Sequence, residues 1–515
     1  MQRRKMATLH FALLPKVLTM RPLLLLLIVI SGMATIHARI IPIGPGREIT
    51  RLSQANGMVG PGDTLLLDDG LYSDGSQFLE DWTGDALHPI VILAKNEHQA
   101  IFRGGTEAIH LIRCAFLQLE GLVVEQQTGN GINIDDGGNY TTPTHHITVR
   151  NCIFRDMAAD GNNDLLKLSG LDDFLVEGCS FTNGGDGGSG IDMVGCHHGI
   201  IQDNYFDQAG VSGIQAKGGT QFIRIQRNIL KDLVQRALNL GGSTGLEYFR
   251  PPLDLPINDA FEAADLEVFS NLFLGSWSPI AYVGSIRVLV INNTIYHPAN
   301  WVVRILQETT ESGFLACAEN VFQNNLIILD QDLTEVNVGP NTDPESFTFS
   351  HNLWYNEASQ SWSPQLPVAD AGQIIDDPQL AKPADGNFQP APTSPVVGQG
   401  NPDRAPDTDF WGNPFQVPPS IGAIEGLIAT TARQPFPDTP ALSIEPSVAT
   451  DYLTIRFPYS GGYVRIINIK GVTLIDGEVV DSPMRFDITN LVPGFYFVRW
   501  EGDRPGFAIR KFVKM

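Results

Sequence analysis

The chain is poor in charged residues, and basic residues are scarcer than acidic ones. Only 18% of its 515 residues are charged, and 34 basic against 57 acidic residues give a net charge of −23. Binding to phosphates is driven by clustered Lys and Arg, so this balance argues against nucleic acid as a partner. A polyanionic substrate would need local basic groups or a bridging cation.

Cysteine is also scarce. Its five residues are odd in number and scattered, which fits neither a disulfide framework nor a zinc site. They are Cys114, Cys152, Cys179, Cys196 and Cys317. Cys152 and Cys179 occupy equivalent places in a repeat described below, where a small buried residue fits. A disulfide between these two after export is the alternative interpretation.

The N-terminus carries a short apolar run over residues 22–30, preceded by Arg21 and followed by small residues before Ala38. A basic segment, a short apolar segment and a small cleavage site are typical of an export signal. The run is too short for a stable membrane anchor. We therefore predict a signal peptide over 1–38 and no transmembrane anchor after its cleavage.

No amphipathic helical pattern interrupts the middle of the chain; a six-residue motif recurs there instead. Its first and sixth positions are apolar and its fourth is Asn or Cys, in copies that begin at 149, 176, 201, 225, 268, 290, 322 and 349. The first steps, 149→176→201→225, are 27, 25 and 24 residues, a period typical of a solenoid. Stacked Asn side chains would satisfy buried turn groups from coil to coil. The pattern predicts an all-β, parallel β-helix over 39–426.

A second register predicts the working surface. Five short strands, 131–135, 165–169, 190–194, 213–217 and 237–241, each have two apolar positions separated by a polar one. Strand side chains alternate between faces, so the polar residues should form two outward columns across successive coils. The first column is Asn133, Lys167, Asp192, Gln215 and Asn239; the second is Asp135, Ser169, Val194, Lys217 and Gly241. We call these two columns the polar strip.

Two segments are expected to border the polar strip. The insertion 241–259 contains Glu247, Tyr248 and Arg250, a mixture that favours a cleft wall over a plain surface loop, since aromatic and charged groups bind sugars. Residues 304–308 are the second candidate, because Arg304 continues the Asn239 column beyond Ala281.

The repeat resembles the secreted right-handed parallel β-helix proteins of the pectate-lyase-like superfamily, over roughly residues 40–425. The stretch G60-P-G-D-T-L-L-L-D-D-G-L-Y72 resembles the entry coil of its chondroitinase B and alginate lyase branch. The resemblance implies a right-handed, single-stranded β-helix that acts on a polysaccharide. Lys217 stands where chondroitinase B-like enzymes carry a strand lysine. Their partner arginine would fall near Leu240 or Gly241, so Arg236 is the expected substitute.

Two reactions, β-elimination by a lyase and hydrolysis by a glycoside hydrolase, are the alternatives for the strip. A lyase needs a base beside a uronate carboxylate, neutralisation of that carboxylate and a proton donor. Lys217 is the candidate base, or else a solvated lysine, and Lys167 either assists it or forms a structural ion pair with Asp192. His197 is the candidate acid, or else a solvated corner residue. The residues expected to bind substrate are Asn133, Asp192, Gln215, Asn239, Glu247, Tyr248, Arg250 and Arg304.

Three further alternatives stay open. Asp135, Asp164 and Asp192 would suit Ca²⁺, which takes several carboxylate oxygens, although such acidic residues also cap turns. A glycoside hydrolase needs two carboxylic groups across the scissile bond, and the strip has no such outward pair on neighbouring strands. The third alternative is a non-catalytic glycan-binding or surface protein.

The C-terminal residues 441–515 read as a separate β domain behind a Pro/Thr linker over 427–440. Their alternating segments and the terminal R510-K-F-V-K-M515 resemble the C-terminal sorting domain of the type IX secretion system. This implies passage across an outer membrane, with release or attachment at the cell surface. The expected partners are this secretion machinery and a polysaccharide, with the protein itself a monomer.

Overall fold

The structure, a computed structural model, describes residues 38–426 except 74 and 360, and residues 442–514 except 447, 458–460, 469–472 and 502–506. Nearly all of the signal peptide and the linker expected from the sequence therefore lie outside the described residues. Within those residues, helix is limited to four short 3₁₀ turns: η1 (Leu52–Ala55), η2 (Leu246–Tyr248), η3 (Pro344–Ser346) and η4 (Pro383–Asp385). None of these is long and apolar enough to cross a membrane.

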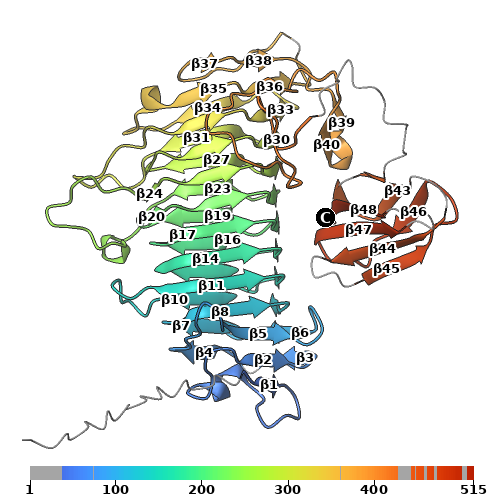
Figure 1. Ribbon diagram of the computed structural model, residues 1–515. Helices are drawn as coiled ribbons and strands as arrows, with labels where there is room; N and C mark the ends of the chain where they lie inside the picture. Colours follow the sequence, from blue (N-terminus) through green and yellow to red (C-terminus); the bar gives the residue numbers. More distant parts are fainter. Residues whose placement is uncertain are drawn as a thin grey trace, which may run out of the picture. The chain divides into compact units, whose positions relative to one another are not determined.

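The chain from residue 40 to 375 winds into stacked coils whose strands form three parallel sheets (Figure 1). Sheet C carries the polar strip. Its strands are β4 (Gln77–Glu80), β7 (Ile109–Ile112), β10 (Ile132–Asp135), β13 (Leu166–Ser169), β16 (Ser189–Val194), β19 (Ser212–Lys217), β23 (Arg236–Gly241), β27 (Ser278–Val283), β31 (Trp301–Leu306) and β34 (Thr334–Val338).

Sheets A and B complete each coil. The strands of sheet A are β1 (Ile40–Ile43), β2 (Thr64–Leu67), β5 (Ile90–Ala94), β8 (Ala115–Glu120), β11 (Thr144–Arg150), β14 (Leu171–Glu177), β17 (His197–Gln202), β20 (Thr220–Gln221), β21 (Arg224–Gln226), β24 (Ala263–Ala264), β25 (Glu267–Phe269), β28 (Ser285–Ile286), β29 (Leu289–Ile291), β32 (Val321–Gln323), β35 (Thr348–Ser350) and β37 (Asp370–Ala371). The strands of sheet B are β3 (Gly70–Tyr72), β6 (Ala100–Arg103), β9 (Val123–Glu125), β12 (Ile153–Arg155), β15 (Ser180–Thr182), β18 (Tyr205–Asp207), β22 (Ile229–Lys231), β26 (Leu272–Leu274), β30 (Thr294–Tyr296), β33 (Leu326–Leu329), β36 (Leu353–Asn356) and β38 (Ile374–Ile375). An antiparallel pair, β39 (Leu380–Lys382) and β40 (Asn387–Pro390), follows the last coil.

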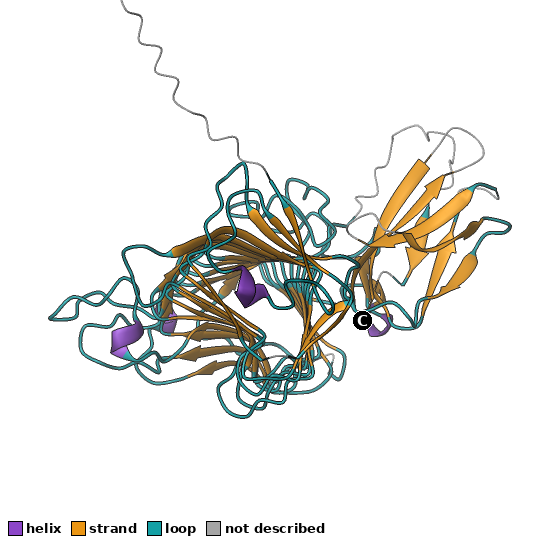
Figure 2. Ribbon diagram, turned by 90° about the horizontal axis from the view of Figure 1, so that it is seen from below, coloured by secondary structure: helices purple, strands orange, loops and turns teal. Residues whose placement is uncertain are grey.

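The core is built from the inward side of each strand, as the alternation predicts. Figure 2 shows the three sheets surrounding the interior. On β10, Ile132 and Ile134 are fully buried, and the equivalent apolar pairs on the next four strands of sheet C are buried too. The rings of Phe154, Phe181 and Phe206 stack on successive coils with centroids 4.8 and 4.7 Å apart. This separation equals the spacing of neighbouring strands, so identical positions pack directly on one another.

The predicted Asn column lies at the corner between sheets A and B and is buried. From Asn228 onward, each Asn amide oxygen accepts from both the backbone N–H and the side-chain Nδ2 of the preceding Asn; Asn228 Oδ1, for example, lies 3.0 Å from both donors of Asn204. The residue just before it, Arg227, has a φ of 55°, which gives the chain a sharp corner. The ladder runs through Asn204, Asn228, Asn271, Asn293, Asn325 and Asn352.

Cys152 and Cys179 extend this ladder as free, buried thiols. The backbone N–H of Cys152 points at the Cys179 sulfur, and the N–H of Cys179 donates to Asn204 Oδ1 at 2.9 Å. All five cysteines are free and buried. The packing interpretation therefore holds, and the alternative of a disulfide between Cys152 and Cys179 does not.

The described part of the tail forms two sheets with a core of its own. One contains β41 (Ser443–Glu445), β43 (Tyr452–Arg456) and β46 (Met484–Asp487); the other contains β42 (Val448–Ala449), β44 (Tyr463–Asn468), β45 (Thr473–Glu478), β47 (Gly494–Glu501) and β48 (Phe507–Lys514). Apart from the parallel pair β42 and β48, these strands are antiparallel. Leu453, Ile455, Val464, Ile466 and Val498 are fully buried between them. This arrangement suits a small β-sandwich.

Candidate functional site on sheet C

The first column of the polar strip has the register predicted from the sequence. Neighbouring strands pair Asn133 with Lys167, Lys167 with Asp192, Asp192 with Gln215, and Gln215 with Asn239. The column continues through Ala281 on β27 to Arg304 on β31, as predicted. The structure extends it further, to Asn337 on β34 at one end and to His110 on β7 at the other. In the second column, Asp135, Ser169, Val194 and Lys217 are paired as expected.

Asp192 lies at the centre of the strip but beneath its surface, with 0% of its side chain exposed. Two lysines share its carboxylate: Lys167 Nζ hydrogen-bonds Asp192 Oδ2, and Lys217 Nζ lies 3.4 Å from the same oxygen. Asp192 was expected to bind substrate, whereas its burial means that it holds the lysines instead. The other oxygen, Oδ1, has no hydrogen-bond partner among the described residues.

Lys167 is held as an ammonium ion. Burial disfavours its charge, but Asp192 and Asp164 outweigh that cost and raise its pKa. A raised pKa makes Lys167 a poor base, and the alternative of a structural ion pair with Asp192 fits this geometry better. Lys217 contacts Asp192 at the longer distance and has no second carboxylate paired with it among the described residues, so it is the more weakly held lysine.

Asp164 completes this buried group from the loop before β13. Its Oδ2 lies 3.5 Å from Lys167 Nζ, and its Oδ1 accepts a hydrogen bond of 2.8 Å from the Ser189 backbone. Burial and the neighbouring charge of Asp192 raise the pKa of Asp164 to about 6. Two carboxylates and two lysines therefore form one electrostatic unit across β13, β16 and β19.

The three aspartates expected to hold Ca²⁺ do not converge. Asp135 points toward the preceding coil and bonds His110 Nε2, while the ammonium of Lys167 contacts both Asp164 and Asp192. Among the described residues, no three His, Cys, Asp or Glu side chains are arranged to hold a metal ion. These residues alone do not fit a calcium ion, which takes 6–8 oxygen ligands.

A second cationic group lies at the other end of the strip. Arg236 donates from Nη1 to Asn239 Oδ1 at 2.7 Å and from Nη2 to Glu308 Oε1 at 2.9 Å. The guanidinium of Arg304 lies over the ring of Trp301, 4.6 Å from its centroid. Burial and the charge of Arg236 lower the pKa of Arg304, so the two guanidinium groups are close enough to repel each other.

The insertion after β23 begins as a close cover over Lys217. A Cβ on Gly242 would approach Gln215 Nε2 to 2.9 Å and Lys217 Cδ to 3.2 Å, so only glycine fits without displacing them. Buried Glu262 fastens the loop by accepting hydrogen bonds from the backbone N–H groups of Gly218 and Thr244, each 2.9 Å long. The insertion therefore borders the strip, as expected for a wall.

Farther along, this loop separates into exposed and buried parts. Tyr248 is 60% exposed and Glu247 is exposed, and the Glu247 carbonyl accepts a 2.8 Å hydrogen bond from Tyr140 Oη. Arg250 is buried and forms a two-pronged ion pair with Asp172 through bonds of 2.7 and 2.8 Å. Arg250 was expected to bind substrate, but its guanidinium anchors the loop to the corner between sheets C and A.

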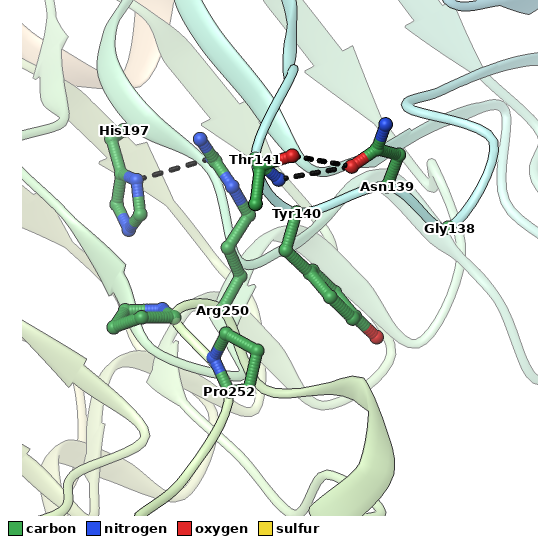
Figure 3. A pocket seen from close by; sticks show the side chains of 8 residues that line it. Gly138, Asn139, Tyr140, Thr141, His197, Arg250 and Pro252 are labelled. Atoms are coloured by element: carbon green, nitrogen blue, oxygen red, sulfur yellow. Dashed lines mark hydrogen bonds between the residues drawn. The ribbon is translucent and has the colours of Figure 1, made fainter.

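His197, the expected acid, lies beside Arg250 on sheet A and not on the strip. Its Nδ1 is 3.2 Å from Arg250 Nη1 (Figure 3), and its Nε2 is 3.1 Å from the Gly219 carbonyl. Burial and the charge of Arg250 lower the pKa of His197, so the neutral ring accepts at Nδ1 and donates at Nε2. Both residues line a corner pocket of about 470 Å³, formed by Gly138, Asn139, Tyr140, Thr141, His197, Arg250, Pro251 and Pro252.

The sequence-based reasoning missed His110. Its ring lies between Glu107, 3.0 Å from Nδ1, and Asp135, at Nε2. Burial opposes the charged ring, but hydrogen bonds to these two carboxylates outweigh it and raise the pKa of His110 to about 9. A signal existed, because I109-H-L-I112 has the same inward pair as I132-N-I-D135 and lies 23 residues earlier.

The fold class is thus a right-handed parallel β-helix, and the match to a family model agrees with it. Residues 94–248 match the family model described as "Right handed beta helix region". No curated protein matches the chain.

Solved structures resemble this chain at low sequence identity. The pectate lyase Pel9A is 15% identical, covers 76% of this chain and 96% of its own, and has a TM-score of 0.46. An alginate lyase from Paenibacillus sp. str. FPU-7 is 14% identical, with coverages of 59% and 97% and a TM-score of 0.33. The lacto-N-biosidase from Eubacterium ramulus is 15% identical, with coverages of 66% and 67% and a TM-score of 0.37.

Proposed function

We propose that this protein cleaves an acidic, uronate-containing polysaccharide by β-elimination on the polar strip of sheet C. The observation that carries the proposal is the charge of the strip. Four cationic side chains, Lys167, Lys217, Arg236 and Arg304, lie along it in a chain whose net charge is −23. A local cationic surface on an acidic protein favours a polyanionic ligand.

In this proposal Lys217 is the base that removes the proton beside the uronate carboxylate. It is the more weakly held of the two lysines on Asp192, and Lys167 already compensates that carboxylate. Gln215, its neighbour in the first column, is placed to donate an amide hydrogen bond to the substrate. Asn239 was also expected to bind substrate, but it is buried and holds Arg236 through its Oδ1 instead.

The proton donor for the leaving oxygen is Lys217 itself, after it has taken the proton. Both ring nitrogens of His197 are engaged at the corner, so His197 is not used. The insertion that covers Lys217 limits the access of water to this step.

The test is a screen of the full-length protein against uronate polymers, read by the ultraviolet absorbance of the unsaturated chain ends that β-elimination creates. Parallel reactions with added calcium and with a chelator address the metal, since substrate oxygens could complete a set that Asp164 and Asp192 alone do not provide. New reducing ends without that absorbance would indicate hydrolysis and contradict the proposal.

A non-catalytic glycan-binding protein is the second candidate, and one observation favours it. The ion pair of Lys217 with the buried carboxylate of Asp192 also suits a lysine that binds a uronate carboxylate and takes no part in proton transfer. This candidate predicts saturable binding of a uronate polymer without new chain ends.

We also propose that the tail directs the protein through the type IX secretion system to the medium or the cell surface. Support comes from the motifs of residues 441–515, from the separate tail core and from the export signal expected over 1–38. The mature protein would then meet polysaccharide outside the cell as a monomer.

A further inference from the structure

The two arginines at the end of the strip have more hydrogen-bonding capacity than the described protein groups use. Arg236 is paired with Asn239 and Glu308, but its Nε is buried without a partner. The Nε of Arg304 is buried without a partner as well, and within the described residues Arg304 forms no hydrogen bond or ion pair. Buried donors without partners are costly, and charged ones more so.

The strands bring these arginines together across a small residue. Ala281 lies between Asn239 and Arg304 in the register of sheet C. Because alanine has a one-carbon side chain, the longer side chains from β23 and β31 can approach each other above it. Among the described residues, Glu308 is the one carboxylate paired with them; it contacts Arg236 and is itself partly exposed. The described side chains here therefore leave one positive charge uncompensated.

Arg304 is also held in place. Its guanidinium stacks on Trp301, and the Trp301 ring packs against Trp277 of the preceding coil with centroids 4.4 Å apart. Arginine stacked on an aromatic ring keeps its planar fork free to bind a carboxylate with two hydrogen bonds. The stacking thus positions the fork before a ligand arrives.

We infer that Arg236 and Arg304 form a subsite for the carboxylate of a uronate unit remote from the cleavage point. The inference rests on the proposed function and deepens it. From β19, which carries Lys217, to β31 there are three strand spacings, or about 14 Å along the axis. This exceeds one sugar ring, so the charge bound here belongs to another unit of the same chain.

The subsite predicts how affinity depends on oligosaccharide length. Calorimetric titrations would use oligosaccharides of galacturonate, mannuronate and glucuronate of increasing length, with neutral cello-oligosaccharides alongside, on full-length protein carrying Lys217→Ala so that no substrate is consumed. We expect affinity to rise once the chain reaches from the Lys217 position to Arg304. Adding Arg304→Gln should remove this rise, weaken binding of the longer acidic chains at least tenfold and reduce its salt dependence.

The matched control is Arg287→Gln, because Arg287 is an exposed arginine outside the strip whose charge is already paired with Asp265. It should leave every titration unchanged. Equal effects of the two substitutions, an unchanged length dependence in Arg304→Gln, or no binding of any acidic oligosaccharide would overturn the subsite. Binding that depends on Arg304 without any cleavage by the unsubstituted protein would instead retain the subsite and refute the lyase. Cleavage that is unaffected by Arg304→Gln would retain the lyase and refute the subsite.

Discussion

At the scale of single residues, the strip is organised around one buried carboxylate, Asp192, which is shared by two lysines. Asp192 cannot touch a substrate, yet its contacts determine where both ammonium groups lie. A paired buried carboxylate is strongly destabilising when its partners are removed together, since the charge is then left uncompensated. Removing one lysine leaves the other in place, so the role of Lys217 can be tested without unfolding the site.

Lys217→Ala should lower turnover on a uronate polymer by about 10²-fold or more, the usual contribution of a general base. The melting temperature should barely change, because Lys167 continues to neutralise Asp192. The control is Lys231→Ala, which removes a lysine paired with Asp207 on sheet B, away from the strip. Initial rates and thermal unfolding of both variants provide the measurement, and full activity of Lys217→Ala would place the base elsewhere.

His110 makes a prediction about pH. An unfolded histidine has a pKa near 6.5, and in the fold it rises to about 9, so folding favours the protonated ring. The stabilisation is then fully present below pH 6.5 and is lost as pH rises through 9. His110→Gln should remove about 1–2 kcal/mol of this pH-dependent stability, allowing for solvent screening. Urea unfolding at pH 6 and pH 9 measures this change in the free energy of unfolding. If the free energy of unfolding changed equally between the two pH values in both proteins, the pairing of His110 would be contradicted.

The residues of the strip were predictable where they depend on strand alternation, and unpredictable where they depend on depth or on corners. Spacing alone placed Lys217 beside Asp192 and Gln215. It could not reveal that Asp192 is buried, because alternation distinguishes inside from outside but not a covered outside position. Nor could it predict that Arg250 reaches back to Asp172 on β14, since the two residues lie 78 positions apart and Arg250 belongs to an irregular insertion.

At the scale of elements, the Asn ladder fixes the corner between sheets A and B. Asn228 donates to the Ile201 carbonyl and to Asn271, and accepts from both donors of Asn204. A single side chain thus satisfies polar groups on three successive coils. The same corner repeats down the solenoid, which is why a motif read from sequence could predict it.

Asn228→Leu should reduce the free energy of unfolding by at least about 3 kcal/mol, because several buried donors and acceptors lose partners worth about 1–3 kcal/mol each. The comparison is Asn258→Leu in the exposed part of the insertion, which should be nearly neutral. Chemical unfolding followed by circular dichroism reports both. Equal stability of the two variants would mean that the ladder contributes little.

The fold itself was predictable at this scale because a solenoid repeats the same sequence pattern in every coil. Each coil must present apolar residues inward at the same places, so a pattern missed in one copy is recovered in the next. Insertions do not repeat, and the course of residues 241–259 was therefore open to two interpretations. The structure favours the wall, since Gly242 packs against Gln215 and Lys217, and Glu262 holds Thr244 beside Gly218.

At the scale of the whole molecule, charge is distributed unevenly. The chain is strongly acidic, yet the middle coils of sheet C carry four largely buried cations, Lys167, Lys217, Arg236 and Arg304, paired with three carboxylates. The acidic remainder of the protein would repel a polyanion, whereas these cations would attract it. An approaching acidic polysaccharide would therefore be oriented along the polar strip. Raising the ionic strength should therefore weaken binding of an acidic polysaccharide and not of a neutral one.

The last prediction concerns the coils and the tail, which have separate cores. The tail strands bury their own apolar residues, among them Leu453, Ile466 and Val498, while the coils form a continuous core of their own. A domain with its own core can fold alone. Residues 39–426 produced without the tail should therefore fold and cleave, or bind, the polysaccharide as the longer chain does.

In the native host, the same truncation should abolish appearance outside the cell while the protein accumulates within the envelope. Immunoblots of cell fractions and activity of the purified truncated protein measure the two effects separately. A truncated protein that fails to fold would show that the coils depend on the tail, and one that is still exported would remove the sorting role.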